Sequence, residues 1–295
     1  MIPAPEGFVQ VKRGQMWLYL RESHAEALLG IQVQRIGEWL YRDLWDRNVS
    51  FGRGMVAIKR PALPDGSGLV IKGYRHGGLF GNLLSSRYPS PRRALEAVAA
   101  GDAARRAGVP VPLVVVVAAE RVLPFGFRLY EASVEVLGAE PLSVALGFGS
   151  GPPAPLPSGA RSRRRMLVEA CGRSIRALHD ARIDHTDLNL ANLLATNSGS
   201  GTQVYVHDFD SAIFGPSLSP ARRLKALQRL YRSAVKLHPR HLPPPPLMQA
   251  RWLRAYCEGD DALARYLISR RASFSHHVRR HRLLWKQPDT PRSAA

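Results

Sequence analysis

Two short segments of the chain carry the residue types that phosphoryl transfer requires. The first, residues 185–189, reads His-Thr-Asp-Leu-Asn and is followed at Asn192 by an apolar strand. The second, residues 204–210, is a short apolar strand that ends in His-Asp-Phe-Asp. Phosphoryl transfer asks little covalent chemistry of a protein, because its rate depends on positioning and on neutralising charge. Acidic and amide side chains at strand ends are suited to both tasks.

Asp187 is the candidate catalytic residue, and Asn192 and Asp208 are the candidate metal ligands. In a kinase catalytic loop, an Asp meets the substrate hydroxyl and an Asn five positions later holds a metal ion. Asp208 follows the second strand, where kinases place their other metal-binding Asp. Mg²⁺ prefers oxygen ligands and bridges the phosphates of ATP. Each motif alone also fits a turn or a helix cap, but the two in this order predict transfer that depends on ATP and Mg²⁺.

Two neighbours of Asp187 are expected to support the loop. At this place in kinase loops the histidine holds the backbone by packing and hydrogen bonding, so we expect His185 to be structural. Asn189 stands where protein kinases tend to have Lys. The sequence leaves two roles open for Asn189: contact with phosphate or substrate, or a cap on the turn.

A lysine at the end of an apolar strand is the candidate nucleotide cation. Lys72 ends the segment 69–72, and Lys59 ends the preceding segment 55–59. Lys72 is preferred because the helix that contains Glu96 follows it, and an ion pair between a strand Lys and a helix Glu positions the cation in kinases. The sequence therefore predicts a Lys72–Glu96 pair and leaves Lys59 as a rival.

Gly52 and Gly54, on either side of Arg53, are the candidate phosphate-covering loop. Their backbone N–H groups could cradle phosphate before the strand 55–59. A full G-x-G-x-x-G pattern is absent, and a plain hairpin turn explains two glycines equally well. Both readings stay open.

Composition excludes several classes of protein. The chain has 295 residues, of which 45% are hydrophobic and 22% are charged, as in an ordinary globular protein of one or two domains. No apolar run reaches the ~20 residues of a membrane span. The first seven residues lack the basic start and apolar stretch of a secretory signal. Cys171 and Cys257 are too few for a disulfide framework or a zinc site, which favours a reducing, cytoplasmic setting.

The net charge of +19 has two interpretations, one without and one with a functional role. It indicates either a solvated Arg-rich surface or attraction to an anionic membrane or a phosphorylated substrate. No zinc finger, aromatic RNA-binding motif or helix-turn-helix pattern is present, so nucleic acid is not an expected partner. The basic segment 270–286 predicts either an interfacial membrane segment or a final helix packed on the C-terminal part of the chain.

Strand-like segments precede helical ones along the chain. The predicted strands are residues 55–59, 69–72, 114–118 and 127–136, with a helix from Pro91 through Ala100 that Gly101 terminates. Helical spacing begins at Arg163, and further helices are expected at residues 219–237, 248–257 and 261–269. We therefore predict an α+β, protein kinase-like two-lobed fold. Residues 1–137 would form the nucleotide-binding lobe, and residues 138–295 the helical catalytic and acceptor-binding lobe.

The chain also resembles the lipopolysaccharide kinases, especially those that act on 3-deoxy-D-manno-octulosonic acid (Kdo). The fifth-position Asn of His-Thr-Asp-Leu-Asn and the final Asp of Asp-Phe-Asp make these motifs more specific than those of generic kinases. The resemblance runs from about residue 50 to 215 and rests on residues 71–79, 86–88, 108–112, 185–192 and 207–210.

The resemblance implies an activity and a place for it. It implies a cytoplasmic enzyme, peripheral on the inner membrane, that transfers the γ-phosphate of ATP to a hydroxyl of Kdo or another inner-core sugar on a lipopolysaccharide precursor. It implies Asp187 as the base, Asn192 and Asp208 as metal ligands and Lys72 as the nucleotide cation, where the family often has Arg. The alternatives are a small-molecule or protein kinase of the same fold, or a non-catalytic membrane-associated kinase-like binding module.

Overall fold

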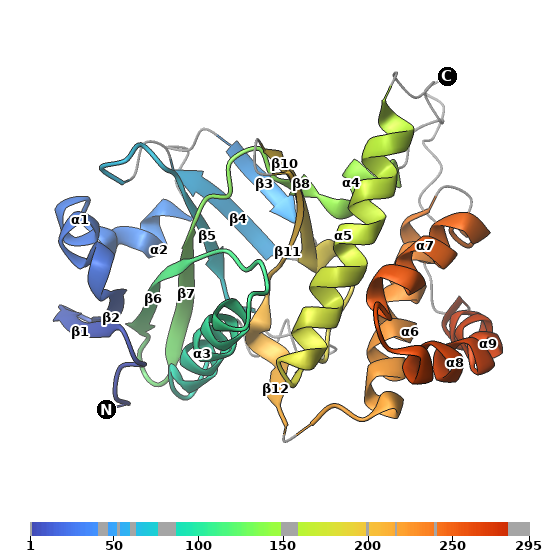
Figure 1. The fold of residues 1–295 in the computed structure, drawn as a ribbon. Helices are drawn as coiled ribbons and strands as arrows, with labels where there is room; N and C mark the ends of the chain where they lie inside the picture. Colours follow the sequence, from blue (N-terminus) through green and yellow to red (C-terminus); the bar gives the residue numbers. More distant parts are fainter. Residues whose placement is uncertain are drawn as a thin grey trace, which may run out of the picture.

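The chain folds into a strand-rich lobe followed by a helical lobe, the order predicted from the sequence (Figure 1). The computed structural model describes residues 2–40, 47–51, 54–59, 63–75, 87–148, 159–198, 201–215, 217–238 and 241–282. For residues 47–51 and 54–59 it describes the backbone alone. The long helix α5 (Ala160–Asp180) stands between the sheet and the helices that follow it in the chain.

Seven antiparallel strands build the first lobe, in the order β1-β2-β6-β7-β5-β4-β3. The four strands predicted from the sequence are present as β4, β5, β6 and β7. The strands at the start of the chain were not predicted. The strands are β1 (Phe8–Arg13), β2 (Met16–Arg21), β3 (Arg47–Phe51), β4 (Gly54–Lys59), β5 (Leu69–Gly73), β6 (Val114–Arg121) and β7 (Phe127–Val134).

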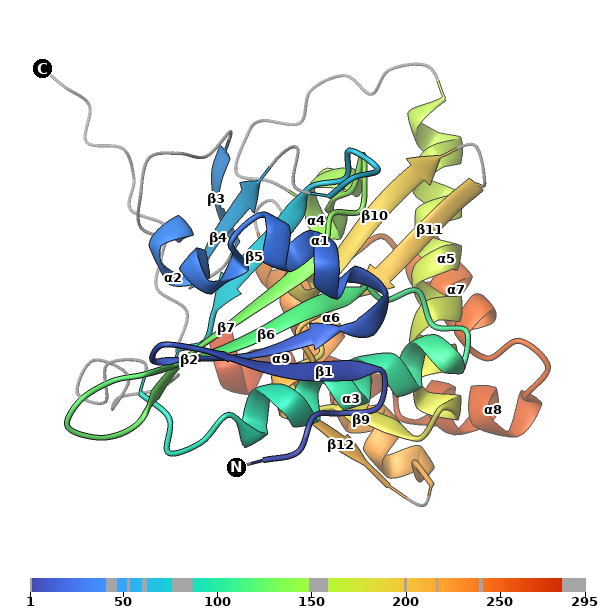
Figure 2. The same ribbon diagram turned by 90° about the vertical axis from the view of Figure 1, so that its left-hand side faces the viewer.

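Side-chain alternation gives this sheet two buried faces. Leu18 and Leu20 of β2 pack with the short helices α1 (Ala25–Gly30) and α2 (Ile36–Trp39), which cover one face (Figure 2). Tyr19, between them, points to the other face and packs with α3 (Arg92–Arg106). Because successive strand residues point to opposite sides, each strand contributes to both layers. The sheet is thereby held between helices.

Helix α3 runs past the glycine that was predicted to end it. Gly101 lies inside α3, where a Cβ atom would be 3.6 Å from Phe209 and from Val111. The helix instead ends before Gly108, whose φ of +82° is the left-handed conformation that commonly terminates helices. The absence of a side chain at position 101 lets α3 lie close to Phe209, beside one of the two chemical motifs.

The second lobe is mostly helical, and its predicted helices are confirmed. The apolar stripe of α5 is buried, with Leu167, Ile175 and Leu178 each 0% exposed. None of the described helices is long and apolar enough to cross a bilayer. The other helices are α4 (Leu142–Ala145), α6 (Pro220–Leu237), α7 (Pro246–Tyr256), α8 (Asp261–Ser269) and α9 (Arg271–Arg282).

Short strands and turns carry the loops between the lobes. Strand β10 (Leu193–Ser198) pairs with β11 (Gly201–Val206) and with β8 (Glu140–Pro141). Strand β9 (Ile183–His185) pairs with β12 (Ala212–Phe214). The chain passes from the large sheet to β8 between Val134 and Glu140, the link in which the predicted lobe boundary lies.

One continuous apolar cluster joins the two lobes. Ala97 and Ala104 of α3, together with Val111 after it, pack into the same cluster as Leu167 of α5 and Phe209. Helix α3 therefore contacts the sheet with one side and the helical lobe with the other. This packing holds the sheet at a defined position over the motifs of the second lobe.

The buried His179 of α5 makes the fold sensitive to acid. His179 is 1% exposed, and its Nδ1 lies 2.7 Å from the hydroxyl of Tyr256 in α7. Burial, and next the nearby Arg223 guanidinium, lower the pKa of His179 to about 3. Between the ordinary pKa of 6.5 and about 3, the unfolded chain binds a proton that the folded chain does not. Stability contributed by the neutral ring is therefore lost as the pH falls.

We expect His179→Gln to be less stable than the wild type at pH 8, because it loses the bond to Tyr256. Between pH 8 and pH 5 the variant should lose on the order of 2 kcal/mol less stability than the wild type does. Urea unfolding at the two pH values measures the difference. The exposed His276 of α9 provides the control, since His276→Gln should keep the wild-type pH dependence. Equal losses in wild type and His179→Gln would contradict the assignment.

Candidate active site

The β10–β11 hairpin brings the two chemical motifs together. Leu193 pairs with Val206, so the residues next to them, Asn192 and His207, leave the hairpin side by side. The backbone N–H of His207 donates to the carbonyl of Asn192 at 3.1 Å. Asp208 follows at once. The candidate metal ligands Asn192 and Asp208 therefore come from adjacent parts of the backbone.

The backbone carbonyl of Asp187 is the anchor of the loop. It accepts hydrogen bonds from the Asn189 side chain at 2.9 Å and from the Asn192 side chain at 3.0 Å. Asn189 Oδ1 also accepts from the backbone N–H of Ala191 at 2.8 Å. Two roles were left open for Asn189, and in the structure its side chain caps the turn. The carboxylate of Asp187 is exposed.

His185 supports the loop, as predicted. It is 0% exposed, its Nε2 lies 3.1 Å from the His207 carbonyl oxygen, and its ring packs on Phe209. Burial lowers the pKa of His185, so the ring is neutral at physiological pH. Next to it, the Thr186 hydroxyl donates to the carbonyl of Ser211 at 2.7 Å. The two motifs are thus bonded to each other on both sides of Asp187.

Lys72 reaches across the lobes to Asp208. Its Nζ lies 2.5 Å from Asp208 Oδ1, and the two side chains are 24% and 28% exposed. Burial alone would lower the pKa of Lys72, but the carboxylates of Glu131, Asp208 and Asp210 raise it above its ordinary value. The amine is therefore fully protonated. It is the cation that β5 presents to the second lobe.

The predicted Lys72–Glu96 ion pair is wrong. Glu96 lies on an exposed side of α3, where it accepts a hydrogen bond from Arg92 at 2.8 Å, and its side chain is 65% exposed. Besides Asp208, the carboxylate that acts on Lys72 is that of Glu131, which stands opposite Lys72 in the β5–β7 pairing. The Tyr74 hydroxyl donates to Glu131 at 2.7 Å and fixes its orientation. A neighbouring strand, not the helix, supplies the acidic partner.

Asp208 and Asp210 have carboxyl groups with opposite pKa shifts. Burial would raise the pKa of Asp208, but Lys72 outweighs it and holds this pKa well below its usual range. Burial and the neighbouring Asp208 carboxylate raise the pKa of Asp210 to about 6. Arg93 of α3 also bonds to Asp210 at 3.1 Å. Asp208 is thus the more acidic of the two groups and is held ionised by Lys72, and Asp210 ties the motif to α3.

The ends of β3 and β4 next to the candidate phosphate loop lie at the same end of the sheet as Lys72. Val56 of β4 pairs with Lys72, and Gly54 begins β4 opposite Phe51 of β3. Gly52 lies outside the described residues. The backbone therefore forms a β3–β4 hairpin around this position. Lys59 pairs with Leu69 at the other end of β5. Of the two candidate lysines, Lys72 is therefore the one at the end of β5 that lies next to Asp208.

Similarity to known proteins identifies the family of this chain. The sequence model of the lipopolysaccharide kinase (Kdo/WaaP) family matches residues 65–256, a range that contains Lys72, Asp187, Asn192 and Asp208. The chain belongs to this family. The predicted resemblance is confirmed.

Several curated relatives are Kdo kinases. One from Mannheimia succiniciproducens is 29% identical over 175 residues, covering 58% of this chain and 67% of the relative. One from Vibrio cholerae is 31% identical over 174 residues, covering 57% of this chain and 65% of the relative. The matched part thus spans about two thirds of these lipopolysaccharide kinases.

A solved structure confirms the kinase-like fold. WaaP in complex with acyl carrier protein is 19% identical and has a TM-score of 0.57, with 91% of this chain and 99% of that chain covered. At this identity the similarity concerns the fold alone. WaaP and the present chain thus share the α+β, two-lobed architecture that was predicted from the sequence.

Whether the site fits a metal ion depends on the oxygen atoms that its side chains offer. The Asn192 side chain donates through its nitrogen to the loop, which leaves its oxygen as the atom for a cation. Asp208 is ionised beside it and faces Lys72. Mg²⁺ commonly takes one or two protein oxygens and completes its shell with phosphate and water. The pair fits that donor set.

Glu131, Tyr74 and Asp210 were not given roles from the sequence. Glu131 is a charged residue within the strand-like run 127–136, and such a residue can face solvent or a site. The pairing register decides between these, because a shift by one residue moves every side chain to the opposite face. Strand spacing alone does not supply that register.

Proposed function

We propose that this lipopolysaccharide kinase family member transfers the γ-phosphate of ATP, with Mg²⁺, to a hydroxyl of Kdo or another inner-core sugar of a lipopolysaccharide precursor. The observation that carries the proposal is the exposed carboxylate of Asp187 on a loop bonded to Asn192, beside the Lys72–Asp208 pair. Membership of the family and the Kdo kinase relatives support the choice of acceptor.

Each residue has a proposed task. Asp187 orients the acceptor hydroxyl and accepts its proton as the new bond to phosphorus forms. Asn192 and Asp208 would hold Mg²⁺, which would neutralise charge on the phosphates. ATP supplies the phosphoryl group, and ADP leaves as the bond between the γ-phosphorus and its bridging oxygen breaks. Lys72 binds phosphate oxygens through its amine, whose protonated form the Glu131 carboxylate favours. Backbone N–H groups near a cation favour anions, which supports Gly52 and Gly54, at the connection of β3 and β4, as the phosphate cover.

The lobes divide the work in this proposal. Residues 1–137 bind the nucleotide, and residues 138–295 carry the base, the metal ligands and the acceptor. The net charge of +19 supports a peripheral position on the cytoplasmic side of the inner membrane, where a lipid-linked acceptor would lie.

The test is incubation of the full chain with labelled ATP and Mg²⁺ against a panel of acceptors. The panel contains a Kdo-bearing lipid A precursor, free Kdo, a heptosylated core sugar and a generic protein, and mass spectrometry locates the added phosphate. Label on a Kdo or core-sugar hydroxyl supports the proposal. Label only on the protein favours a protein kinase of the same fold, and no ATP binding at all favours a non-catalytic module.

Glu131 and Glu96 give a matched test of the corrected ion pair. Glu131→Gln should lower kcat/KM for ATP by about tenfold, because Lys72 loses the carboxylate opposite it. Glu96→Gln should change it less than about twofold, since exposed helix pairs contribute only ~0.3–0.5 kcal/mol. Steady-state kinetics with varied ATP measure both variants. A larger loss in Glu96→Gln than in Glu131→Gln would restore the helix residue as the partner of Lys72.

A further inference from the structure

The geometry points to an anion-binding site for the acceptor, formed by α6 and α9 beside Asp187. We define the α6–α9 basic cluster as the five side chains Arg229, Arg232, His277, Arg280 and His281. We propose that it binds a negatively charged oxygen group, a carboxylate or a phosphate, on the sugar that Asp187 activates. This inference rests on the proposed function and names the substrate class of that site.

Helix α6 is bonded directly to the catalytic loop. Its Ser233 hydroxyl accepts a hydrogen bond from the backbone N–H of Leu190 at 2.9 Å. One turn earlier, Arg229 Nη2 lies 3.4 Å from the carbonyl oxygen of His185 and 3.4 Å from Asp184 Oδ1. These contacts flank Asp187 on both sides along the chain. They fix the position of the α6 side chains relative to its carboxylate.

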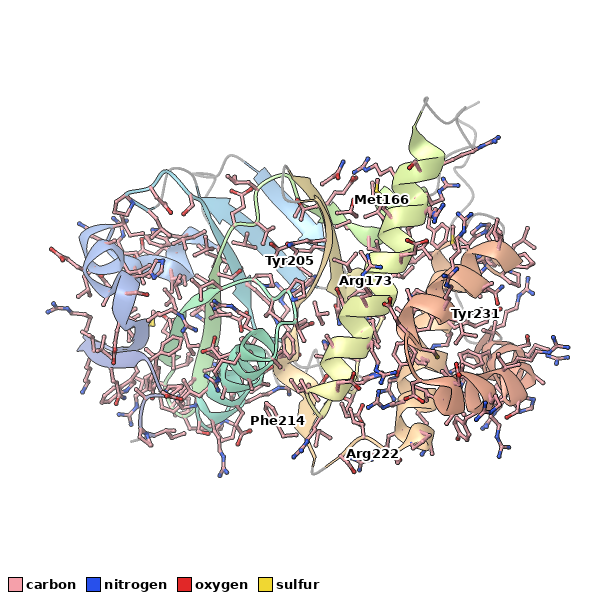
Figure 3. All side chains as sticks on the ribbon, in the orientation of Figure 1. Met166, Arg173, Tyr205, Phe214, Arg222 and Tyr231 are labelled. Atoms are coloured by element: carbon pink, nitrogen blue, oxygen red, sulfur yellow. The ribbon has the colours of Figure 1, made fainter. Side chains whose placement is uncertain are left out.

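Helix α9 is docked on α6 by a pair of aromatic rings and by hydrogen bonding. The rings of Tyr231 and Phe274 meet edge to face with centroids 5.5 Å apart, and Tyr231 is labelled in the helical lobe of Figure 3. Gln228 Nε2 donates to the Ser273 hydroxyl at 3.0 Å. Two predictions were made for the basic segment 270–286. In its described part the second is confirmed, because this part is a helix packed on the second lobe. The packing gives α9 a fixed register against α6.

That register places the histidines of α9 against the arginines of α6. His277 Nε2 lies 3.5 Å from Arg232 Nη1, and the rings of His277 and His281 are 4.8 Å apart. His277 and His281 are one helical turn apart and share one side of α9. Arg279 lies on the opposite side of the helix from His277, and both Arg279 and His276 are exposed. The basic cluster is therefore one face of α9 meeting one face of α6.

The cluster holds more positive than negative groups. Burial and then Arg229 lower the pKa of Arg232, while the nearby carboxylate of Asp187 raises it. Burial and then Arg232 also lower the pKa of His277, with His281 and Arg280 acting in the same direction. The arginines therefore disfavour the protonated forms of His277 and His281, and Asp184 and Asp187 compensate the arginine charges only in part. A bound anion would compensate the rest of this charge.

The chemistry of the cluster suits a sugar acid or a sugar phosphate. Arginine presents a planar set of N–H donors that matches carboxylate and phosphate oxygens. The acceptor hydroxyl must lie about 3 Å from Asp187, so an anionic group elsewhere on the same sugar falls within reach of α6. The Kdo kinase relatives are named for an acidic sugar. An anion held by the cluster would orient the ring and select one hydroxyl for transfer.

A binding experiment tests the cluster without requiring activity. Histidine ring signals of the full chain are followed by NMR while inorganic phosphate, free Kdo or Kdo methyl ester is added. We expect saturable shifts of His277 and His281 with phosphate or Kdo, little change with the uncharged ester, and no shift of His276. In Arg232→Gln the dissociation constant should rise about tenfold or more. Stronger binding of Kdo than of phosphate would identify a carboxylate as the preferred group, and the reverse a phosphate.

A kinetic experiment separates this inference from the proposed function. His277→Gln and Arg232→Gln should raise KM for the anionic acceptor about tenfold, with a smaller change in KM for ATP, and the matched variants His276→Gln and Arg279→Gln should behave as the wild type. If no acceptor is phosphorylated but the NMR shifts occur, the proposed function fails and the anion site stands.

If transfer occurs but the NMR shifts are absent, the anion site is overturned. The same holds if the control variants lose as much as Arg232→Gln does. Loss of binding to anionic vesicles with an unchanged acceptor KM would also overturn it and assign these cations to the membrane. If Arg232→Gln does not fold, His277→Gln, whose side chain is half-buried, decides the same question.

Discussion

Asp187→Asn is expected to lower turnover by about 10²–10⁴-fold, the usual contribution of a positioned general base. The substitution keeps the size of the side chain and removes the carboxylate that would accept the hydroxyl proton. The loop should keep its shape, because the hydrogen bonds from Asn189 and Asn192 end on the backbone carbonyl of Asp187 and not on its side chain. ATP binding should therefore stay within about twofold of wild type, as expected when only an interaction of the transition state is removed.

Single-turnover transfer to the acceptor, together with calorimetric titration of ATP, measures the two effects separately. Asp65→Asn is the matched control, since Asp65 is an exposed turn residue that accepts hydrogen bonds from Ser67 and an Asn oxygen can still accept them. It should behave as the wild type in both measurements. Wild-type turnover in Asp187→Asn would remove this residue from the mechanism, and a parallel loss of ATP affinity would indicate a misfolded loop.

Local sequence was sufficient for the loop and for most of the elements around it. The interval from Asp187 to Asn192 is one tight turn, so its side chains are placed by bonds within the turn and need no distant partner. The apolar stripe of α5 was likewise readable, because its residues lie on one side of a single helix. In both cases the information is contained in a few consecutive residues.

The errors concern contacts between distant parts of the chain. Glu96 follows Lys72 along the sequence, yet Glu131 stands opposite Lys72 because β5 pairs with β7. Gly101 has the residue type that ends helices, but its place against Phe209 comes from the packing of α3 on the second lobe. Strand order and helix packing are set by the whole core, so local spacing does not determine them.

The same distinction explains why α9 carried two predictions. Its sequence has cations beside apolar residues, a pattern shared by membrane-surface helices and by helices packed at a protein surface. Contacts with Tyr231 and Gln228 of α6 select the second arrangement for the described part. The packing also bears on function, because it places His277 against Arg232, on the helix that is bonded to the loop carrying Asp187.

Asp208→Asn is expected to remove the effect of Mg²⁺ on ATP binding. The amide can still accept a hydrogen bond from Lys72, so the contact between the lobes is kept while the charge that would bind the cation is lost. Loss of an outer-shell partner typically costs about 10–100-fold in metal affinity, and loss of a direct ligand should cost more. Without Mg²⁺ the variant should bind ATP at least as well as the wild type, because the carboxylate no longer repels the phosphates or neutralises Lys72.

Calorimetric titration of ATP with and without Mg²⁺ gives the deciding quantity, the ratio of the two dissociation constants. We expect a large ratio for the wild type and a ratio near one for Asp208→Asn. Asp187→Asn is the matched control, since it removes a carboxylate from the same site but not from the proposed metal ligands, and it should keep the wild-type ratio. If Asp208→Asn also keeps that ratio, the metal is held elsewhere and the Lys72–Asp208 pair serves only to join the two lobes.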